Sequence, residues 1–246
     1  MDFGIDSRFI GGQRASYSET LGGVLLPGKT LFVRISGSRG YNTQIENSDT
    51  DYAAVYVLST DEILSLASAQ ETFTHNKPDI EAHEVKKFCE LLLKGNPSMV
   101  EHLFAKEKIY ADTFWNDLLL HKKEFLSVQV VKQYLGYALS QLHRLENHQS
   151  LQTTSGKYNN KWAYHMIRVL NDAYRIAQGE EPVVWKEGVE RDLLLNIRHE
   201  KYPQEKIVEM AKREIVKIDN LKPWPLPEFG NRDFLNGWLL NIRKQS

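Results

Sequence analysis

The sequence predicts an α+β fold, with an α/β unit in residues 1–110 and a helical unit in residues 111–246. Two observations lead to this prediction. Before residue 110, short segments rich in β-branched and aromatic residues alternate between apolar and polar positions, as strands do. After residue 110, apolar residues recur at helical spacing in one segment after another. We therefore expect the boundary between the two units near residues 107–112.

Two strands are expected first, at residues 30–38 (TLFVRISGS) and 49–58 (DTDYAAVYVL). The next patterned segment, residues 78–97 (PDIEAHEVKKFCELLLKGNP), begins extended and then becomes helical. Gly95 and Pro97 at its end form a typical helix stop. Residues 1–28 are weakly patterned, and only SETLGGVLL (residues 18–26) predicts a short strand or helix.

The second unit is expected to contain amphipathic helices with an apolar face each. Their ranges are 125–146, 161–179, 188–200, 203–221 and 233–245. A polar segment separates the first two, and the proline-rich stretch KPWPLPEFG precedes the last. Helices that follow one another in this way predict a bundle that packs beside the strands of the first unit.

The composition excludes several classes of protein. A formal net charge of −1 gives no overall positive field, so nucleic-acid binding would need a local basic patch. Cys89 is the only cysteine, which excludes an intrachain disulfide, predicts no disulfide-linked partner and fits a reducing compartment. The sequence contains no run of about 18 apolar residues, so it predicts no membrane span. The first residues, MDFGIDSRFIGG, lack the pattern of a signal peptide, so we expect a cytoplasmic protein.

A phosphate-binding pattern, G-x-x-x-x-G-K-[ST], is matched by residues 23–30 (GVLLPGKT). Such a loop binds phosphate when a helix begins directly after it. The residues that follow here, LFVRIS, predict a strand instead. We therefore expect an ordinary turn before a strand at this place.

The stretch GSRGYNTQIENSDTDYAAVYV, residues 37–57, contains the strongest candidate for chemistry. Alternation along the expected strand places Asp49 and Asp51 on one face, where their charges repel unless a ligand separates them. Mg²⁺ is suited to such carboxylates, and it usually also takes substrate phosphates. Gly37 and Ser38 offer a close backbone approach, an amide and a hydroxyl for a phosphate. The alternative is an exposed turn, because NSDTD is also typical of turns.

These motifs resemble the signature of the nucleotidyltransferase superfamily typified by DNA polymerase beta. They are more similar to a bacterial and phage branch with RNA-ligase-associated members, in which D-h-x-h-[YH]-x-h-x-K-F and N-P-x-h-h-E follow (h is apolar). Here these are DIEAHEVKKF and NPSMVEHLF. YLGYALSQLHRL, KWAYHMIRVL, LLLNIRHE and LPEFGNRDF also have counterparts, so the resemblance extends from about residue 31 to the end. One departure is Asn42, where the branch has glycine, although asparagine also tolerates a left-handed backbone.

The resemblance implies a small mixed-sheet nucleotidyltransferase core followed by a C-terminal helical bundle. It also implies transfer of a nucleoside monophosphate from an NTP to an acceptor hydroxyl, with release of pyrophosphate. The superfamily needs a third carboxylate on a neighbouring strand, which by motif position is Asp79, with Glu81 as the fallback. Asp49, Asp51 and Asp79 would then be catalytic and would hold Mg²⁺ or Mn²⁺. The alternative for Asp79 is an acid that leads a helix after Pro78.

Nucleotide binding is assigned in the same way. Gly37 and Ser38 would bind the β- and γ-phosphates, and Arg39 could reach the triphosphate. Lys161, His165 and Arg168 are spaced i, i+4 and i+7, so they share a helix face that could receive phosphates. The alternative is that these three residues lie on a solvated helix face without a role in binding. Further candidates left undecided are Lys86, Glu101 and Arg198.

The acceptor is open between an RNA end, a small molecule and a protein side chain, and RNA is favoured by analogy with the branch. Two other functions are kept as alternatives: a catalytically inactive nucleotide sensor, and one half of a toxin–antitoxin pair. One cysteine and dispersed histidines do not predict a zinc site. Cys89 follows the apolar pattern of its helix, so we expect it in the core.

Overall fold

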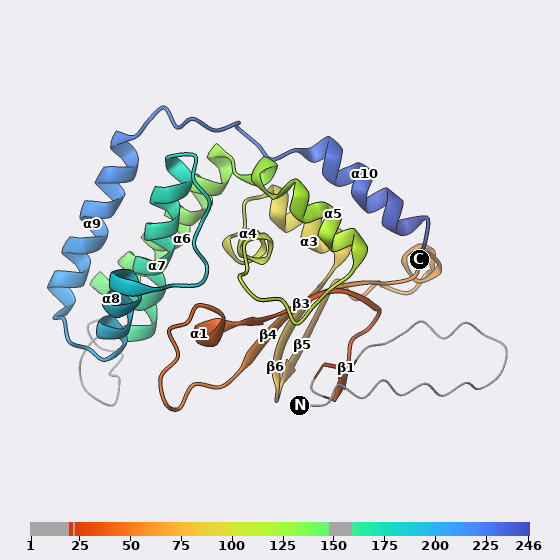
Figure 1. Cartoon of the computed structure of the whole chain (residues 1–246), viewed down its shortest axis with the longest axis horizontal. Helices are drawn as coiled ribbons and strands as arrows, with labels where there is room; N and C mark the ends of the chain where they lie inside the picture. The colour runs from red at the N-terminus through yellow and green to blue at the C-terminus, as the bar shows by residue number, and fades with distance from the viewer. Residues whose placement is uncertain (1–19, 22, 148–158) are drawn as a thin grey trace.

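The protein, described here from a computed structural model, is built around a five-stranded sheet (Figure 1). The structure describes residues 20–21, 23–147 and 159–246. The strands have the order β5-β6-β4-β3-β7, and β4 and β6 are parallel whereas the other pairs are antiparallel. Their bounds are Lys29–Ser36 for β3, Asp51–Val57 for β4, Thr72–Asn76 for β5, Asp79–Glu84 for β6 and Tyr110–Ala111 for β7.

The two faces of the sheet are covered differently, and the alternation of side chains along β4 shows this. Val55 and Val57 point into the large core shared with the helices. Ala54 and Tyr56 point into a smaller core on the opposite face. That second face is covered by the hairpin of β1 (Thr20–Leu21) and β2 (Val24–Leu25) and by residues around α2 (Thr60–Leu64). Apolar residues on both sides of β4 therefore place it at the centre of the fold.

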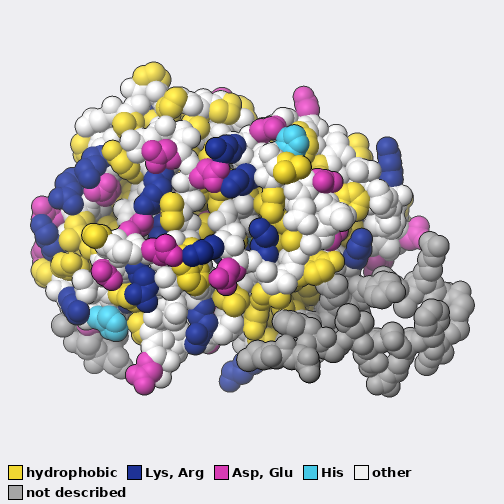
Figure 2. All heavy atoms as spheres, viewed as in Figure 1, with side chains coloured by type: hydrophobic (Ala, Val, Ile, Leu, Met, Phe, Trp, Pro, Cys, Tyr) yellow, Lys and Arg dark blue, Asp and Glu magenta, His cyan; other side chains and the backbone are white. Residues whose placement is uncertain are grey.

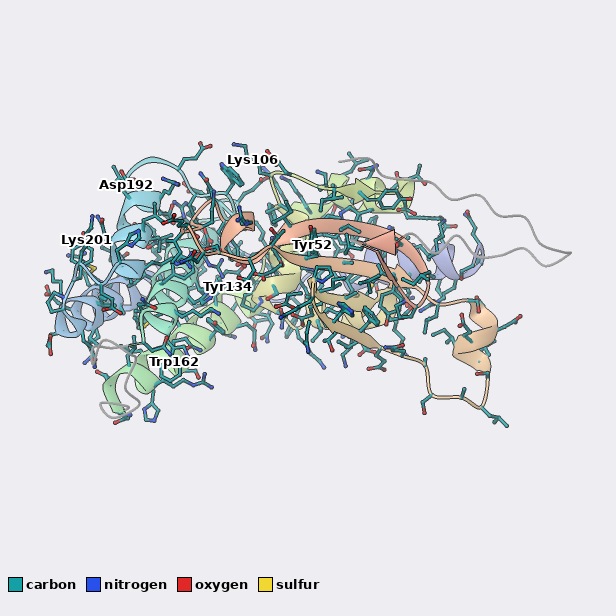
Figure 3. All side chains as sticks on the ribbon, turned by 90° about the horizontal axis from the view of Figure 1, so that it is seen from below. Tyr52, Lys106, Tyr134, Trp162, Asp192 and Lys201 are labelled. Carbon is teal, nitrogen blue, oxygen red and sulfur yellow. The ribbon has the colours of Figure 1, made fainter. Side chains whose placement is uncertain are left out.

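The longer helices form two groups (Figure 1). One group lies over the sheet and consists of α3 (Val85–Leu93), α5 (Thr113–Leu120) and α10 (Arg232–Arg243), with α4 (Pro97–Leu103) beside it. The other is a bundle of α6 (Val128–Asn147), α7 (Asn160–Ala177), α8 (Gly188–Arg198) and α9 (Gln204–Asn220). Figure 3 shows the bundle, labelled at Tyr134, Trp162 and Asp192, beside the sheet, labelled at Tyr52.

Most elements expected from the sequence are confirmed. The α+β class, the mixed sheet, the strand that turns into a helix after Pro78 and the amphipathic helices of the bundle are all present. Residues 18–26 form part of the β1–β2 hairpin, as far as they are described. The pattern at residues 23–30 is not a phosphate loop, because Lys29 and Thr30 lie in β3. Cys89 is buried in the core, as expected.

Two later segments of the chain return to its first part: β7 joins the sheet, and α10 packs on α3. β7 lies at the expected boundary and extends the sheet at β3, where Ala111 pairs with Phe32. The last helix, α10, returns to pack on α3 and α5. Its Arg243 forms an ion pair with Glu84 at 2.5 Å and donates to the carbonyl of Leu58 at 3.0 Å. Within the described ranges, no helix is long and apolar enough to cross a membrane.

Candidate active site

The Gly-Ser turn after β3 forms one turn of helix, α1 (Gly37–Gly40), which lies between the sheet and the bundle (Figure 1). Gly37 has φ +57°, a left-handed conformation that glycine adopts without strain. A Cβ at this residue would lie 1.7 Å from Oδ2 of Asp51. The turn therefore packs directly against the carboxylate at the start of β4.

Asp51 and Asp79 are neighbours in the sheet. Asp51 begins β4, Asp79 begins β6, and the two are paired in the register of these parallel strands. Paired residues on adjacent strands project to the same face, so the two carboxylates lie side by side. Asp79 begins a strand, so the alternative that it leads a helix is wrong. Asp49 lies in the loop before β4 and not in the strand, because β4 begins two residues later than expected.

The charges of these three residues act on one another. Burial raises the pKa of the Asp51 carboxyl, and the negative charges of Asp49 and Asp79 raise it further. The positive charge of Lys161 on α7 acts in the opposite direction. Three carboxylates, from two strands and a loop, thus lie within electrostatic range of one another, and the charge of one lysine from the helical bundle acts on Asp51. Such a concentration of like charge is a feature of functional sites.

The donor set fits a hard divalent cation. Carboxylate oxygens are the ligands that Mg²⁺ prefers, and Mg²⁺ usually takes one or two of them together with substrate phosphates. Among the described residues, no group of three or more His, Cys, Asp or Glu side chains is arranged to enclose a metal ion. The register pair of Asp51 and Asp79 nevertheless supplies two adjacent carboxylates, which matches the one or two that Mg²⁺ usually takes.

Glu81, the fallback for the third carboxylate, lies one pleat further along β6. Its partner in β4 is Ala53, not an acid. Glu81 Oε1 lies 3.2 Å from Nε2 of His83, and this hydrogen bond lowers the pKa of Glu81. Asp79 is therefore the carboxylate of β6 that is placed beside Asp51.

Arg39 makes backbone contacts that the sequence did not predict. Its Nη2 donates to the carbonyl of Ser48 at 2.8 Å, and its Nε donates to the carbonyl of Asp49 at 3.1 Å. The guanidinium thus fixes the loop that carries the first aspartate to the Gly-Ser turn. The described contacts of Arg39 support a role in positioning Asp49.

The loop after α1 is held by the helical bundle. Asn42 has φ +59°, which confirms that asparagine accepts the left-handed backbone here. Its Nδ2 donates to the carbonyl of Lys186 at 2.9 Å, and its own carbonyl accepts from Nε of Arg191 at 2.7 Å. The next residue, Thr43, is buried, and its hydroxyl lies 2.6 Å from that of Tyr164.

The three residues expected to share a basic face on α7 have different surroundings. Lys161 is exposed at the start of the helix, His165 is half-buried, and Arg168 is buried. Arg168 Nη1 donates to Glu101 Oε1 at 2.5 Å. Burial, and then the positive charge of Arg168, lowers the pKa of His165 to about 3, so its imidazole is neutral at pH 7. Of the three, Lys161 is the cation whose charge reaches the carboxylates.

Comparison with known proteins identifies the family. The RNA repair pathway DNA polymerase beta family matches residues 16–221, which is most of the chain. The chain belongs to this family. Its membership confirms the resemblance found in the motifs. A nucleotidyltransferase-like protein from Exiguobacterium sibiricum 255-15 is a similar solved structure, at 12% identity over 88% of this chain and 74% of that chain, with a TM-score of 0.31. No curated protein matches the sequence significantly.

The matched range of the RNA repair pathway DNA polymerase beta family contains every candidate site residue and ends before α10. Lys86, Lys161 and Arg168 do not converge on one basic surface that could bind RNA. Arg168 is buried, and Lys86 lies just after Glu84, at the opposite end of β6 from Asp79. Arg198 is engaged with the loop after α1, because its guanidinium donates to the carbonyl of Thr43.

Sequence reasoning missed two buried residues that contact the site. Arg34 and Tyr41 both approach Glu101, a residue whose role the sequence left undecided. A signal for Arg34 was present: an arginine at an inward position of a strand needs a buried acid as partner. The partner itself could not be found without the fold.

Proposed function

We propose that the protein is a metal-dependent nucleotidyltransferase, which transfers a nucleoside monophosphate from an NTP to an acceptor hydroxyl and releases pyrophosphate. The observation that carries this proposal is the register pair of Asp51 and Asp79, with the charge of Asp49 beside it and Gly37 packed on Asp51. Membership of a DNA polymerase beta family supports the reaction class.

Each group then has a role that its position allows. Mg²⁺ or Mn²⁺ would be held by Asp51 and Asp79 together with phosphate oxygens of the NTP, with Asp49 beside them as the third ligand. The ion would neutralise charge on the reacting phosphate and lower the pKa of the attacking hydroxyl. Asp79 would accept the proton of that hydroxyl. The hydroxyl oxygen forms a bond to the α-phosphorus as the bond to the bridging oxygen breaks, and pyrophosphate leaves with that electron pair. Gly37 and Ser38 would bind the β- and γ-phosphates through backbone N–H groups and the serine hydroxyl.

Lys161 supplies positive charge to the triphosphate. It is exposed, and its charge is felt at Asp51. Arg39 and Arg168 contribute indirectly, because Arg39 fixes the backbone of Asp49 and Arg168 is engaged with Glu101. His165 lies between Lys161 and Arg168 as a neutral group that can donate or accept one hydrogen bond.

An RNA end is the acceptor that we favour, since the family is named for an RNA repair pathway. The net charge of −1 indicates that contacts to RNA are local. Figure 2 agrees with this, because acidic and basic side chains are interspersed over the helices on the face that it shows. A short RNA end needs few phosphate contacts, whereas a long duplex would need a continuous basic surface.

The test is transfer of label from an NTP. Purified protein is incubated with Mg²⁺ or Mn²⁺ and each of the four α-labelled NTPs, with and without total RNA. We expect label on RNA in the wild type and none in Asp49→Ala or Asp51→Asn. The matched control is Asp61→Asn, which removes an exposed carboxylate in the first turn of α2 and should leave transfer unchanged.

Other outcomes have defined meanings. Label on the protein itself would replace RNA by a protein acceptor. Metal-dependent NTP binding without transfer under all conditions would contradict the enzyme and support the nucleotide sensor. Full transfer by Asp49→Ala and Asp51→Asn would overturn the assignment of the site.

A further inference from the structure

A buried carboxylate, Glu101, joins three separate segments around α1. It lies on α4 and is 1% exposed. Its Oε2 accepts a hydrogen bond of 2.6 Å from the hydroxyl of Tyr41, which follows α1 directly. Its Oε1 accepts a hydrogen bond of 2.5 Å from Arg168 on α7, and its Oε2 lies 3.7 Å from Arg34 Nη2 on β3. One side chain thus connects the sheet, the Gly-Ser turn and the helix that carries Lys161.

Tyr41 links Glu101 to the Gly37–Ser38 turn. Its backbone N–H donates to the carbonyl of Gly37 at 3.2 Å and so closes the helical turn. The guanidinium carbon of Arg168 lies 3.8 Å from the centre of the Tyr41 ring. The tyrosine is therefore held twice, by its hydroxyl on Glu101 and by its ring on Arg168. Gly37 and Ser38 cannot shift relative to α7 without breaking one of these contacts.

The cluster of Glu101, Arg34, Tyr41 and Arg168 fixes the positions of its segments more than it adds to the stability of the protein. Two guanidinium groups share one carboxylate in a buried place, and a buried ion pair gains little stability over apolar residues of similar volume. Arg34 Nη1 is also buried without a hydrogen-bond partner among the described residues. A Cβ at Gly40 would lie 3.5 Å from this nitrogen, so the group lies directly under the turn. The cost of burying these charges is explained if the arrangement fixes a functional turn.

We propose that Glu101 is a positioning residue for nucleotide binding: it fixes the Gly37–Ser38 turn through Tyr41 and fixes α7, with Lys161, through Arg168. This inference rests on the proposed function, in which the turn and Lys161 bind the triphosphate. The two contacts set the distance between these binding groups before the nucleotide arrives. Binding is then preorganised, and its ordering cost is reduced.

The test compares two buried tyrosines that each lose one hydroxyl. Tyr41→Phe keeps the ring on Arg168 and removes the bond to Glu101. Tyr56→Phe is the matched control, because Tyr56 is also a buried tyrosine, lies in β4, and donates at 2.5 Å to the carbonyl of Gln70 on the opposite face of the sheet. Each protein is titrated with ATP, GTP, CTP and UTP in the presence of Mg²⁺ by isothermal titration calorimetry, and its thermal unfolding is measured.

Both variants should unfold at a lower temperature than the wild type, since each loses a side-chain hydrogen bond. Only Tyr41→Phe should bind the preferred NTP more weakly, with a Kd raised about tenfold, because small displacements of binding groups have large effects. The Kd of Tyr56→Phe should remain within about twofold of the wild type, as expected for a distant, independent site. In a transfer assay, Tyr41→Phe should raise KM more than it lowers kcat.

An unchanged Kd in Tyr41→Phe would overturn the inference, and so would equal losses of affinity in the two variants. Glu101→Gln provides a second variant, which should weaken binding at least as much as Tyr41→Phe. Should Glu101→Gln fail to fold, the comparison of the two tyrosines still decides. A wild type that binds no NTP would instead contradict the proposed function, so the two failures are distinguishable.

Discussion

Gly37 and Asp51 occupy adjoining space so closely that a Cβ at Gly37 would lie 1.7 Å from Asp51 Oδ2. The backbone of Gly37 is left-handed, with φ +57°, and this brings its Cα to the carboxylate. The segment proposed to bind phosphates and the carboxylate proposed to bind metal are therefore fixed relative to each other by direct contact. Any side chain at residue 37 would separate them.

Gly37→Ala is expected to abolish nucleotidyl transfer and to destabilise the protein. The new methyl group overlaps the carboxylate, and the backbone conformation is unfavourable for alanine. We expect a loss of roughly 1–3 kcal/mol in the free energy of unfolding. Urea unfolding and the labelled-NTP assay measure the two effects.

Gly136→Ala serves as its control. Gly136 lies in α6, and a Cβ there would have no neighbour within 4 Å. Alanine at this position should stabilise the helix by roughly 0.5–1 kcal/mol and leave transfer unchanged. Transfer at the wild-type rate by Gly37→Ala would contradict the proposed contact.

Asp51→Asn is expected to lose transfer but to gain stability at neutral pH. Burial, followed by the charges of Asp49 and Asp79, raises the pKa of Asp51 in the folded protein. A raised acid pKa means that the stability contribution is present at low pH and is lost as pH rises through the folded-state pKa. The ionised carboxylate therefore destabilises the fold at pH 7, and asparagine relieves repulsion on the order of 0.5 kcal/mol.

The measurement is urea unfolding at several pH values in the absence of divalent ions. The advantage of Asp51→Asn over the wild type should shrink as the pH falls towards 4, the usual range of an aspartate. Asp61→Asn should lose a little stability instead, because an acid in the first turn of a helix is favourable. A less stable Asp51→Asn at pH 7 would show that the repulsion is absent.

The sequence was sufficient for the class of the fold and for the three carboxylates that the structure brings together at the candidate site. The strand and helix patterns predicted β3, β4, β6 and the bundle, because these elements have clear apolar periodicity. β5 was missed because it is an edge strand, TFTHN, in which exposed and partly buried residues alternate and no strongly apolar face exists. The adjacency of Asp51 and Asp79 followed from the family motif and not from spacing, since the register of two strands is a tertiary feature.

The inward position of Arg168 could not be predicted from helical spacing. Spacing shows that Lys161, His165 and Arg168 share a face, but it does not show how far that face turns into the protein. Arg168 is buried because Glu101, which is 67 residues earlier in the chain, places a carboxylate beneath α7. A long-range partner of this kind is decided by tertiary packing.

Lys161→Met is expected to weaken binding of Mg²⁺-NTP at low salt. Lys161 is exposed near the carboxylates, so its attraction for a triphosphate is screened by ions. We expect a Kd raised about three- to tenfold in dilute buffer and a smaller effect at high ionic strength. Lys201→Met is the control, because Lys201 is an exposed lysine after α8 (Figure 3). Equal Kd values for Lys161→Met and the wild type in dilute buffer would exclude this role.

His165→Gln is expected to make the protein less sensitive to acid. Burial and then the charge of Arg168 lower the folded-state pKa of His165 to about 3, from an ordinary value of 6.5. As the pH falls below the ordinary value, the unfolded chain binds a proton that the folded protein does not, so stability decreases through this window.

Between pH 7.5 and pH 5, the wild type should therefore lose about 1–2 kcal/mol more of its unfolding free energy than His165→Gln. Urea unfolding at the two pH values measures this difference, and His199→Gln, at an exposed position after α8, should lose as much as the wild type. NMR offers a direct check, because the His165 ring should show no titration between pH 8 and pH 5 when the expected pKa is about 3. A midpoint near 6.5 would show instead that the imidazole is accessible to protons, and only a minor fraction of His165 would then be charged at pH 7.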